Sequence, residues 1–128
     1  MPLVRIDLVE GKGADYGRTV GEVVYDAMIA TINVPKDDRF QIITEHPAAQ
    51  LIFDPTYLGV SRSKDCLCIQ VTLNEGRTTD MKRAFYKAIA DGLHARLGLR
   101  REDVIISLVE VKKENWSFGN GEAQYATA

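Results

Sequence analysis

The sequence predicts an α/β (α+β) sandwich in which a four-stranded sheet carries two helices on one face. Three observations predict this fold. The chain repeats its own pattern after 65 residues, each copy begins with period-2 apolar alternation, and each continues with helical periodicity. Because strand, helix and strand follow one another in both copies, we expect two pseudo-repeated β-α-β units. Right-handed crossovers would place both helices on the same face of the sheet.

The first strand of each unit is the clearest part of the repeat. Three alternate apolar residues of the first unit align with three of the second: Val4, Ile6 and Leu8 with Ile69, Val71 and Leu73. Alternation of this kind is typical of a half-buried strand. Each alternating segment ends in a Glu-Gly pair, at residues 10–11 and 75–76, where glycine allows the backbone to turn.

The apolar period becomes helical after each of these turns. Apolar residues spaced three and four apart occupy residues 20–32 in the first unit and 81–97 in the second. Both segments predict amphipathic helices of about 18 residues. Pro35 limits the first helix, because proline cannot continue the hydrogen-bond ladder. A threonine at 78 or 79 is a candidate N-cap for the second helix, and Gly98 is a candidate stop.

Each predicted helix is followed by another strand, at residues 39–45 and 104–110. Between the units, residues 51–60 favour a small hairpin around a proline turn. The segment beyond Lys112 is aromatic and glycine-rich, so we expect it to fold against the rest of the chain. A chain of 128 residues is the size of one domain, so we expect a single domain over residues 1–128 with repeat halves of about 1–62 and 63–128.

The composition argues against several classes of partner. The chain is 45% hydrophobic and 27% charged with a net charge of −2, which provides no basic surface for nucleic acid. No apolar stretch approaches the roughly 18 residues that span a bilayer, and the N-terminus lacks the apolar region of a signal peptide. We expect a cytoplasmic protein with no nucleic-acid or membrane partner. The sheet face without helices is expected to be buried by oligomerisation.

The two cysteines, Cys66 and Cys68, stand two residues apart in an apolar stretch. Residues so spaced on a strand point to the same face and make a poor disulfide. No further His or Cys completes a zinc-binding spacing. We therefore expect two small buried residues and no metal site.

Pro2 is a candidate catalytic residue. Methionine before a small residue is normally cleaved, so the mature chain is expected to begin with the secondary amine of Pro2. A free α-amino group titrates near pH ~8 and, held at the end of a strand, can act as a base, an acid or a nucleophile. Many chains begin with Met-Pro by chance, so Pro2 alone does not decide the function.

An ordered set of motifs runs along the chain: the strand that begins with proline, Val34–Arg39 (VPKDDR), Glu45–Pro47 (EHP), Arg77-Thr78 and Trp116–Gly119 (WSFG). This set resembles the tautomerase superfamily and, within it, the malonate semialdehyde decarboxylases. The resemblance covers nearly the whole chain. It implies a tautomerase-like β-α-β sandwich, a homotrimer with sites between subunits, and chemistry without a cofactor or metal.

The resemblance also implies roles for individual residues. Pro2 would be the catalytic amine, and Asp38 would polarise or activate a water or that amine. Arg77 would bind the carboxylate of the substrate, while Trp116 and Phe118 would wall the pocket.

The residues alone leave alternatives to these roles. Asp38 stands between Asp37 and Arg39 at a strand start, where a solvated ion pair would also fit, and either aspartate could be the functional one. Arg77 lies before a helix whose N-terminus also favours an anion, and a guanidinium can grip a carboxylate with two hydrogen bonds; a solvated surface charge is the other interpretation. Arg39 and Arg62 are further candidates for the carboxylate contact.

The activity implied by the resemblance is decarboxylation of malonate semialdehyde or a similar short 3-oxo acid. A cationic Pro2 beside the carbonyl oxygen would stabilise the enolate formed as carbon dioxide leaves, and a Schiff base on the same amine is the other route. Hydration of acetylenic acids would use the same proline and an activated water. Two alternatives stay open: a promiscuous keto-enol tautomerase of phenylpyruvate-type acids, and a non-catalytic trimer that binds a small acid or a protein.

Overall fold

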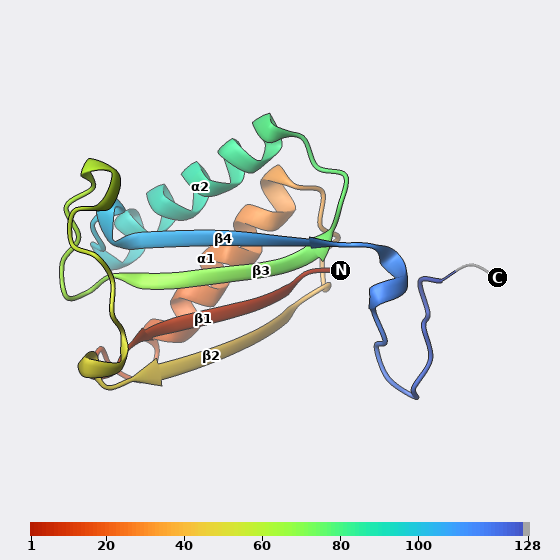
Figure 1. Ribbon diagram of the computed structural model, residues 1–128, viewed down its shortest axis with the longest axis horizontal. Coiled ribbons are helices and arrows are strands. Elements are labelled where there is room, and N and C mark those ends of the chain that lie inside the picture. Colours follow the sequence, from red (N-terminus) through yellow and green to blue (C-terminus); the bar gives the residue numbers. More distant parts are fainter. Residues whose placement is uncertain (127–128) are drawn as a thin grey trace.

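The computed structural model describes residues 1–126 and shows a four-stranded sheet with two helices on one face (Figure 1). The strands are β1 (Leu3–Val9), β2 (Phe40–His46), β3 (Leu67–Asn74) and β4 (Val104–Val111). The helices are α1 (Tyr16–Thr31) and α2 (Thr79–Leu97). The predicted fold class is confirmed. In this part of the chain, neither helix is apolar enough over a sufficient length to cross a membrane.

The strand order is β2-β1-β3-β4, with parallel pairs at both edges and an antiparallel pair in the centre. Each β-α-β unit therefore forms one half of the sheet, and the halves meet where β1 pairs with β3. Because the central pair is antiparallel, β1 starts at the end of the sheet where β3 stops. The two ends of the sheet are thus built from equivalent segments of the repeat.

The core lies between the sheet and the helices. The repeat residues of β1 and β3 are buried, with Ile6 and Ile69 at 0% exposure. Opposite them lie Val24 and Met28 of α1 and Phe85 of α2. Burying each large apolar side chain contributes about 1.5–3 kcal/mol, which explains why the alternation predicts the strands so well.

The caps of α2 agree with the sequence. The Thr78 hydroxyl accepts a hydrogen bond from the backbone N–H of Met81 at 3.2 Å, and Gly98 ends the helix with φ of 65°. Gly92 allows the two helices to approach closely, because a Cβ there would lie 2.7 Å from Val23 Cγ1 on α1. The start of α2 is therefore held firmly, directly after Arg77.

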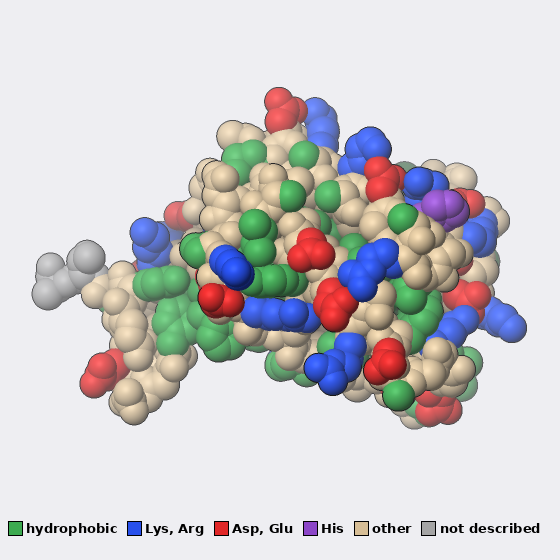
Figure 2. All heavy atoms as spheres, turned by 180° about the vertical axis from the view of Figure 1, so that it is seen from behind, with side chains coloured by type: hydrophobic (Ala, Val, Ile, Leu, Met, Phe, Trp, Pro, Cys, Tyr) green, Lys and Arg blue, Asp and Glu red, His purple; other side chains and the backbone are tan. Residues whose placement is uncertain are grey.

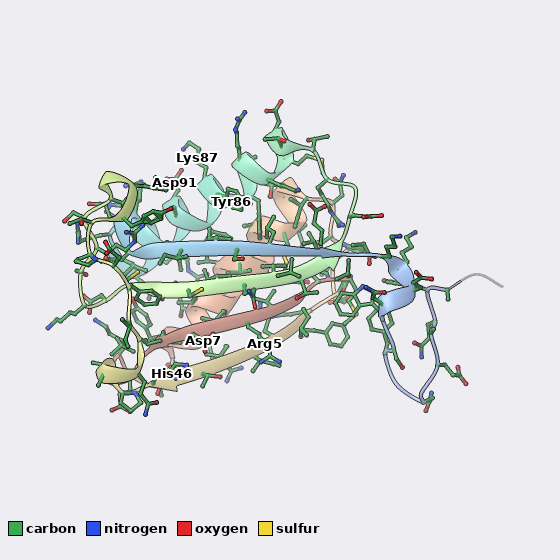
Figure 3. All side chains as sticks on the ribbon, viewed as in Figure 1. Arg5, Asp7, His46, Tyr86, Lys87 and Asp91 are labelled. Carbon is green, nitrogen blue, oxygen red and sulfur yellow. The ribbon has the colours of Figure 1, made fainter. Side chains whose placement is uncertain are left out.

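Both faces of the molecule carry charged side chains. The helical face carries Lys and Arg side chains interspersed with Asp and Glu (Figure 2), including the pair Lys87 and Asp91 at 2.6 Å. On the opposite face of the sheet, Figure 3 shows Asp7 on β1 beside His46 on β2. His46 Nε2 lies 2.6 Å from Asp7 Oδ1. No helix of residues 1–126 covers this second face.

The predicted hairpin at residues 51–60 is wrong. The structure has short 3-10 turns at Ala48–Gln50 and Tyr57–Gly59 in this region, and no strand. The cause is Arg62, whose Nη1 donates hydrogen bonds to the carbonyls of Asp54, Tyr57 and Val60 at 3.1, 3.1 and 3.4 Å. Carbonyls gathered around one guanidinium cannot pair across a hairpin.

The expectation for the cysteines holds for Cys66, which is buried, but not fully for Cys68. Cys68 pairs with Asp7 on the sheet face that lacks helices, so its side chain is only partly buried. Burial raises the pKa of the Cys66 thiol to about 11.

Candidate active site

Four segments converge at the end of the sheet where β1 and β2 begin and β3 and β4 stop (Figure 1). They are the N-terminus, the loop before β2, the turn between β3 and α2, and the tail that follows β4. Three of the residues predicted to be catalytic, Pro2, Asp38 and Arg77, lie in the first three of these segments. The predicted pocket walls, Trp116 and Phe118, lie in the fourth.

The α-amino group in the structure belongs to Met1 and stands in for the amine that Pro2 would carry after processing. It lies 3.9 Å from Asp38 Oδ2 and donates a hydrogen bond to the Tyr125 hydroxyl at 3.4 Å. Pro2 itself is buried. Removal of Met1 would move the amine one residue toward β1, at the same end of the sheet.

The surroundings change the proton affinity of this amine. Burial lowers the pKa of the Met1 amine below its ordinary value of 8.0. The negative charge of Asp38 opposes that effect, whereas the positive charges of Arg77 and Lys113 add to it. The site therefore favours a neutral amine more than a free peptide does.

Asp38, and not its neighbour Asp37, faces the amine. The Asp37 backbone N–H donates to the Tyr25 hydroxyl of α1 at 2.8 Å, and Asp37 adopts a φ of 70°. This left-handed turn directs the following residue to the end of the sheet. The sequence left the choice between the two aspartates open, and the geometry favours Asp38.

Arg39 lies apart from the amine. Its guanidinium donates two hydrogen bonds to Gln41 Oε1, at 3.3 and 3.2 Å, and lies 4.9 Å from the centre of the Tyr25 ring. It lines a separate surface hollow together with Arg18 and Glu22. Within one chain, the structure does not bring Arg39 together with the other predicted site residues.

Arg77 is held by two backbone carbonyls. Its Nε donates to Ile32 O at 3.0 Å, and its Nη1 donates to Asn74 O at 3.1 Å. These bonds fix the guanidinium close enough to the N-terminus to affect the pKa of the amine. Asn74 also accepts a hydrogen bond through Oδ1 from Trp116 Nε1 at 2.8 Å, so it connects the arginine to the tail.

The tail folds back over this end of the sheet, as its composition predicts. The rings of Trp116 and Phe118 stack with centres 5.5 Å apart, and Tyr125 meets Phe118 edge-on at 4.8 Å. Gln124 Oε1 accepts a hydrogen bond from the Phe118 N–H at 2.9 Å and closes the turn. A hollow of about 630 Å³, lined by Asn74 and Tyr125 among others, lies beside the aromatic group.

Three residues of this site were not predicted from the sequence: Asn74, Lys113 and Tyr125. Asn74 is the last residue of β3, where a polar residue ends an apolar alternation, and that change could have identified it. Tyr125 gave no local signal, because its contact with Met1 joins residues 124 positions apart.

Replacement of Tyr125 by Phe is expected to lower kcat/KM two- to fivefold for a reaction that needs the protonated amine. The hydroxyl accepts a hydrogen bond from the Met1 amine, and we expect it to do the same for the Pro2 amine after processing. Such a bond favours the protonated form, and a long bond of this kind contributes about 0.5–1 kcal/mol. The amine pKa should therefore fall, and the pH profile of kcat/KM should move to lower pH. Tyr57→Phe, at the exposed turn near the other end of the sheet, is the matched control. An unchanged profile in Tyr125→Phe would exclude the hydroxyl from the site.

No three His, Cys, Asp or Glu side chains within residues 1–126 lie close enough together to hold a metal ion. The groups gathered here are an amine, a carboxylate, a guanidinium and aromatic rings. Together they can bind an organic anion and exchange a proton with it or attack its carbonyl group. Chemistry without a cofactor stays a prediction.

Comparison with known proteins identifies the family. A family model described as "Tautomerase enzyme" matches residues 38–119, and a second with the same description matches residues 2–61. The chain belongs to the tautomerase family. A tautomerase-family relative, the "Probable tautomerase YusQ" of Bacillus subtilis (strain 168), is 42% identical over 124 residues, which cover 97% of this chain and 98% of the relative.

Two similar crystal structures belong to enzymes with a more specific name. One is a malonate semialdehyde decarboxylase inhibited by 3-bromopropiolate, with a TM-score of 0.89, 36% identity, and coverage of 96% of this chain and 93% of that one. The other is a malonate semialdehyde decarboxylase described with decarboxylase and hydratase activities, with a TM-score of 0.88, 30% identity, and coverage of 96% and 95%. This tautomerase thus shares its fold over nearly its full length with both decarboxylases.

Proposed function

We propose that this tautomerase-family protein decarboxylates malonate semialdehyde or a similar short 3-oxo acid, using the amine of Pro2 after Met1 is removed. The observation that carries the proposal is the meeting of the N-terminal amine, Asp38 and Arg77 at one end of the sheet. The likeness to two malonate semialdehyde decarboxylases supports the substrate class.

The proposed reaction needs few groups. Arg77 binds the carboxylate of the substrate, and the protonated Pro2 amine donates a hydrogen bond to the carbonyl oxygen two carbons away. When the bond to the carboxyl carbon breaks, its electron pair enters the carbonyl and forms an enolate, which the ammonium stabilises. Protonation at carbon then gives the aldehyde, with carbon dioxide as the other product.

Asp38 supports the cation in this scheme. Its Oδ2 is 3.9 Å from the Met1 amine, which stands in for the Pro2 amine, and its charge raises the pKa of that Met1 amine against burial and the nearby cations. In the Schiff-base route the same amine attacks the carbonyl carbon, water leaves, and the iminium accepts the electron pair. Both routes use the same residues. Hydration of an acetylenic acid, with Asp38 activating the water, is a further reaction we propose for this site.

The test combines intact mass, turnover and a pH profile. We expect mature protein that lacks Met1 to release acetaldehyde and carbon dioxide from malonate semialdehyde. The enolate route needs the protonated amine, which exists below its pKa, so kcat/KM should fall as pH rises through the pKa of the Pro2 amine. Burial at this end of the sheet, which lowers the pKa of the Met1 amine, is expected to lower that pKa too. Mature protein without turnover would overturn the decarboxylase proposal.

A keto-enol tautomerase of phenylpyruvate-type acids is the second candidate, and the lowered amine pKa favours it. In that reaction neutral Pro2 acts as the base, so activity should rise with pH where decarboxylation falls. The name of the relative YusQ agrees with a tautomerase activity. Retention of Met1 in protein from the native host would favour the third candidate, a non-catalytic trimer.

We also propose that the protein is a homotrimer with sites between subunits. The uncovered sheet face supports assembly, because it exposes Phe40, Ile42 and Val109 at 47%, 41% and 38%. Arg39 remains a proposed carboxylate contact, made across subunits. Light scattering that gave the mass of one chain would contradict this assembly.

A further inference from the structure

The repeat that builds the fold also builds a second pocket at the opposite end of the sheet. A shift of 65 residues places Leu51 where Trp116 stands in the other half, and Phe53 where Phe118 stands. Both residues line a cavity of about 320 Å³, with Pro55 beside them. The cavity therefore has apolar side chains at the two positions that Trp116 and Phe118 hold in the other half of the repeat.

The polar side of this second pocket has no equivalent of the N-terminal amine. Asp103 is the repeat equivalent of Asp38 and is only 1% exposed. Its carboxylate accepts hydrogen bonds from the Ser63 N–H at 2.7 Å and the Ser63 hydroxyl at 2.6 Å, with Arg100 Nη1 at 3.7 Å. In the second half of the repeat, the chain continues through the position that corresponds to the N-terminus. No free α-amine is therefore present here, and proline chemistry cannot occur.

The charges around the second pocket favour an anion. Arg62 and Lys64 line it, and the Asp103 carboxylate behind it is already bonded by Ser63 and lies near Arg100. Arg62 is held in place by the three carbonyls that its Nη1 contacts. Its Nε is buried and has no hydrogen-bond partner within residues 1–126. Buried N–H groups are nearly always paired in folded proteins, so a small shift of the side chains around it would let this donor meet an acceptor that enters the pocket.

We propose that the second pocket binds a small carboxylate with an apolar tail and does not convert it. The carboxylate accepts a hydrogen bond from Arg62 Nε and lies within the field of Lys64, while the tail packs against Leu51 and Phe53. This goes beyond the proposed function, because no residue of the amine cluster lines the pocket.

Cys66 also lines this pocket, but its thiol is not expected to react with the occupant. Burial raises the pKa of its thiol to about 11, so the thiol stays protonated near neutral pH and is a poor nucleophile. The occupant is therefore expected to bind reversibly.

The experiment is an amide NMR titration of the full chain with 3-phenylpropionate, which has no carbonyl for the proline to act on. We expect saturable shifts at Phe53 and Ser63, separate from any at Asn74. Lys64→Gln should weaken the binding seen at Ser63 about tenfold while leaving the Asn74 curve unchanged. Lys87→Gln, which removes a lysine from the exposed side of α2, is the matched control and should change neither curve.

Arg62→Lys tests the guanidinium directly and should also weaken binding about tenfold. Because Arg62 also orders the turn at residues 54–60, Lys64→Gln keeps the test valid if Arg62→Lys is unstable. Absence of saturable shifts at Ser63 would overturn the proposal, as would equal weakening by Lys87→Gln. Equal binding of inorganic phosphate would overturn the carboxylate assignment. Each readout is independent of turnover, so failure here is distinct from failure of the decarboxylase proposal.

Discussion

Replacement of Pro2 by Ala is expected to lower kcat/KM for decarboxylation of malonate semialdehyde by about a hundredfold or more. Alanine is also small enough for Met1 to be removed, so the variant keeps an N-terminal amine. That amine is primary and rotates freely, whereas the pyrrolidine ring prevents rotation about the N–Cα bond and holds the nitrogen in one orientation. The loss therefore measures the positioned secondary amine.

The control for Pro2→Ala is Pro47→Ala, at an exposed position after β2. It should keep activity within twofold of the original chain. Intact mass must show that Met1 is absent from both variants, because a retained methionine would block the amine for an unrelated reason. Full activity in processed Pro2→Ala would eliminate the proline mechanism.

Replacement of Asp38 by Asn is expected to reduce decarboxylation tenfold to a hundredfold at neutral pH. Asp38 is the negative charge that raises the pKa of the Met1 amine, which stands in for that of Pro2, so its removal leaves burial, Arg77 and Lys113 all lowering the pKa of an amine at this position. The protonated fraction then falls at any given pH. Activity that depends on the cation should disappear at a lower pH than in the original chain.

The matched control is Asp37→Asn, which makes the same chemical change one residue away. Asp37 contacts Tyr25 through its backbone N–H, and that contact survives the substitution. We expect a pH profile of kcat/KM close to the original. Equal losses in the two variants would mean that net charge near the loop matters, and not a specific contact with the amine.

The parts of the fold that the sequence predicts correctly depend on local pattern. Ile6 and Ile69 lie in alternations whose buried face needs no knowledge of distant residues. The Thr78 cap is also local, because the hydroxyl and its donor are three residues apart. Such features are determined within one turn or one strand, so the local order of residues predicts them.

The parts that the sequence does not predict depend on contacts between distant residues. The turn at residues 54–60 forms around the Arg62 guanidinium, and nothing in the proline turn itself indicates that partner. The choice between Asp37 and Asp38 rests on the left-handed backbone at Asp37 and its contact with Tyr25 on α1. Tyr125 joins the site only because the tail returns to the N-terminus.

Asp38 and Asp103 occupy equivalent positions of the 65-residue repeat, but their carboxylates have different numbers of hydrogen-bonding and charged partners. Asp103 is enclosed by two hydrogen bonds from Ser63 and a nearby guanidinium, an arrangement that favours a rigid, stable loop. Asp38 has a single cation at 3.9 Å and keeps its remaining acceptor capacity open. Stability and activity often make opposite demands on a site. In this molecule the Asp103 end of the sheet serves stability, and the Asp38 end holds the candidate active site. Substitutions that raise the free energy of unfolding at the Asp103 end therefore need not affect the candidate active site.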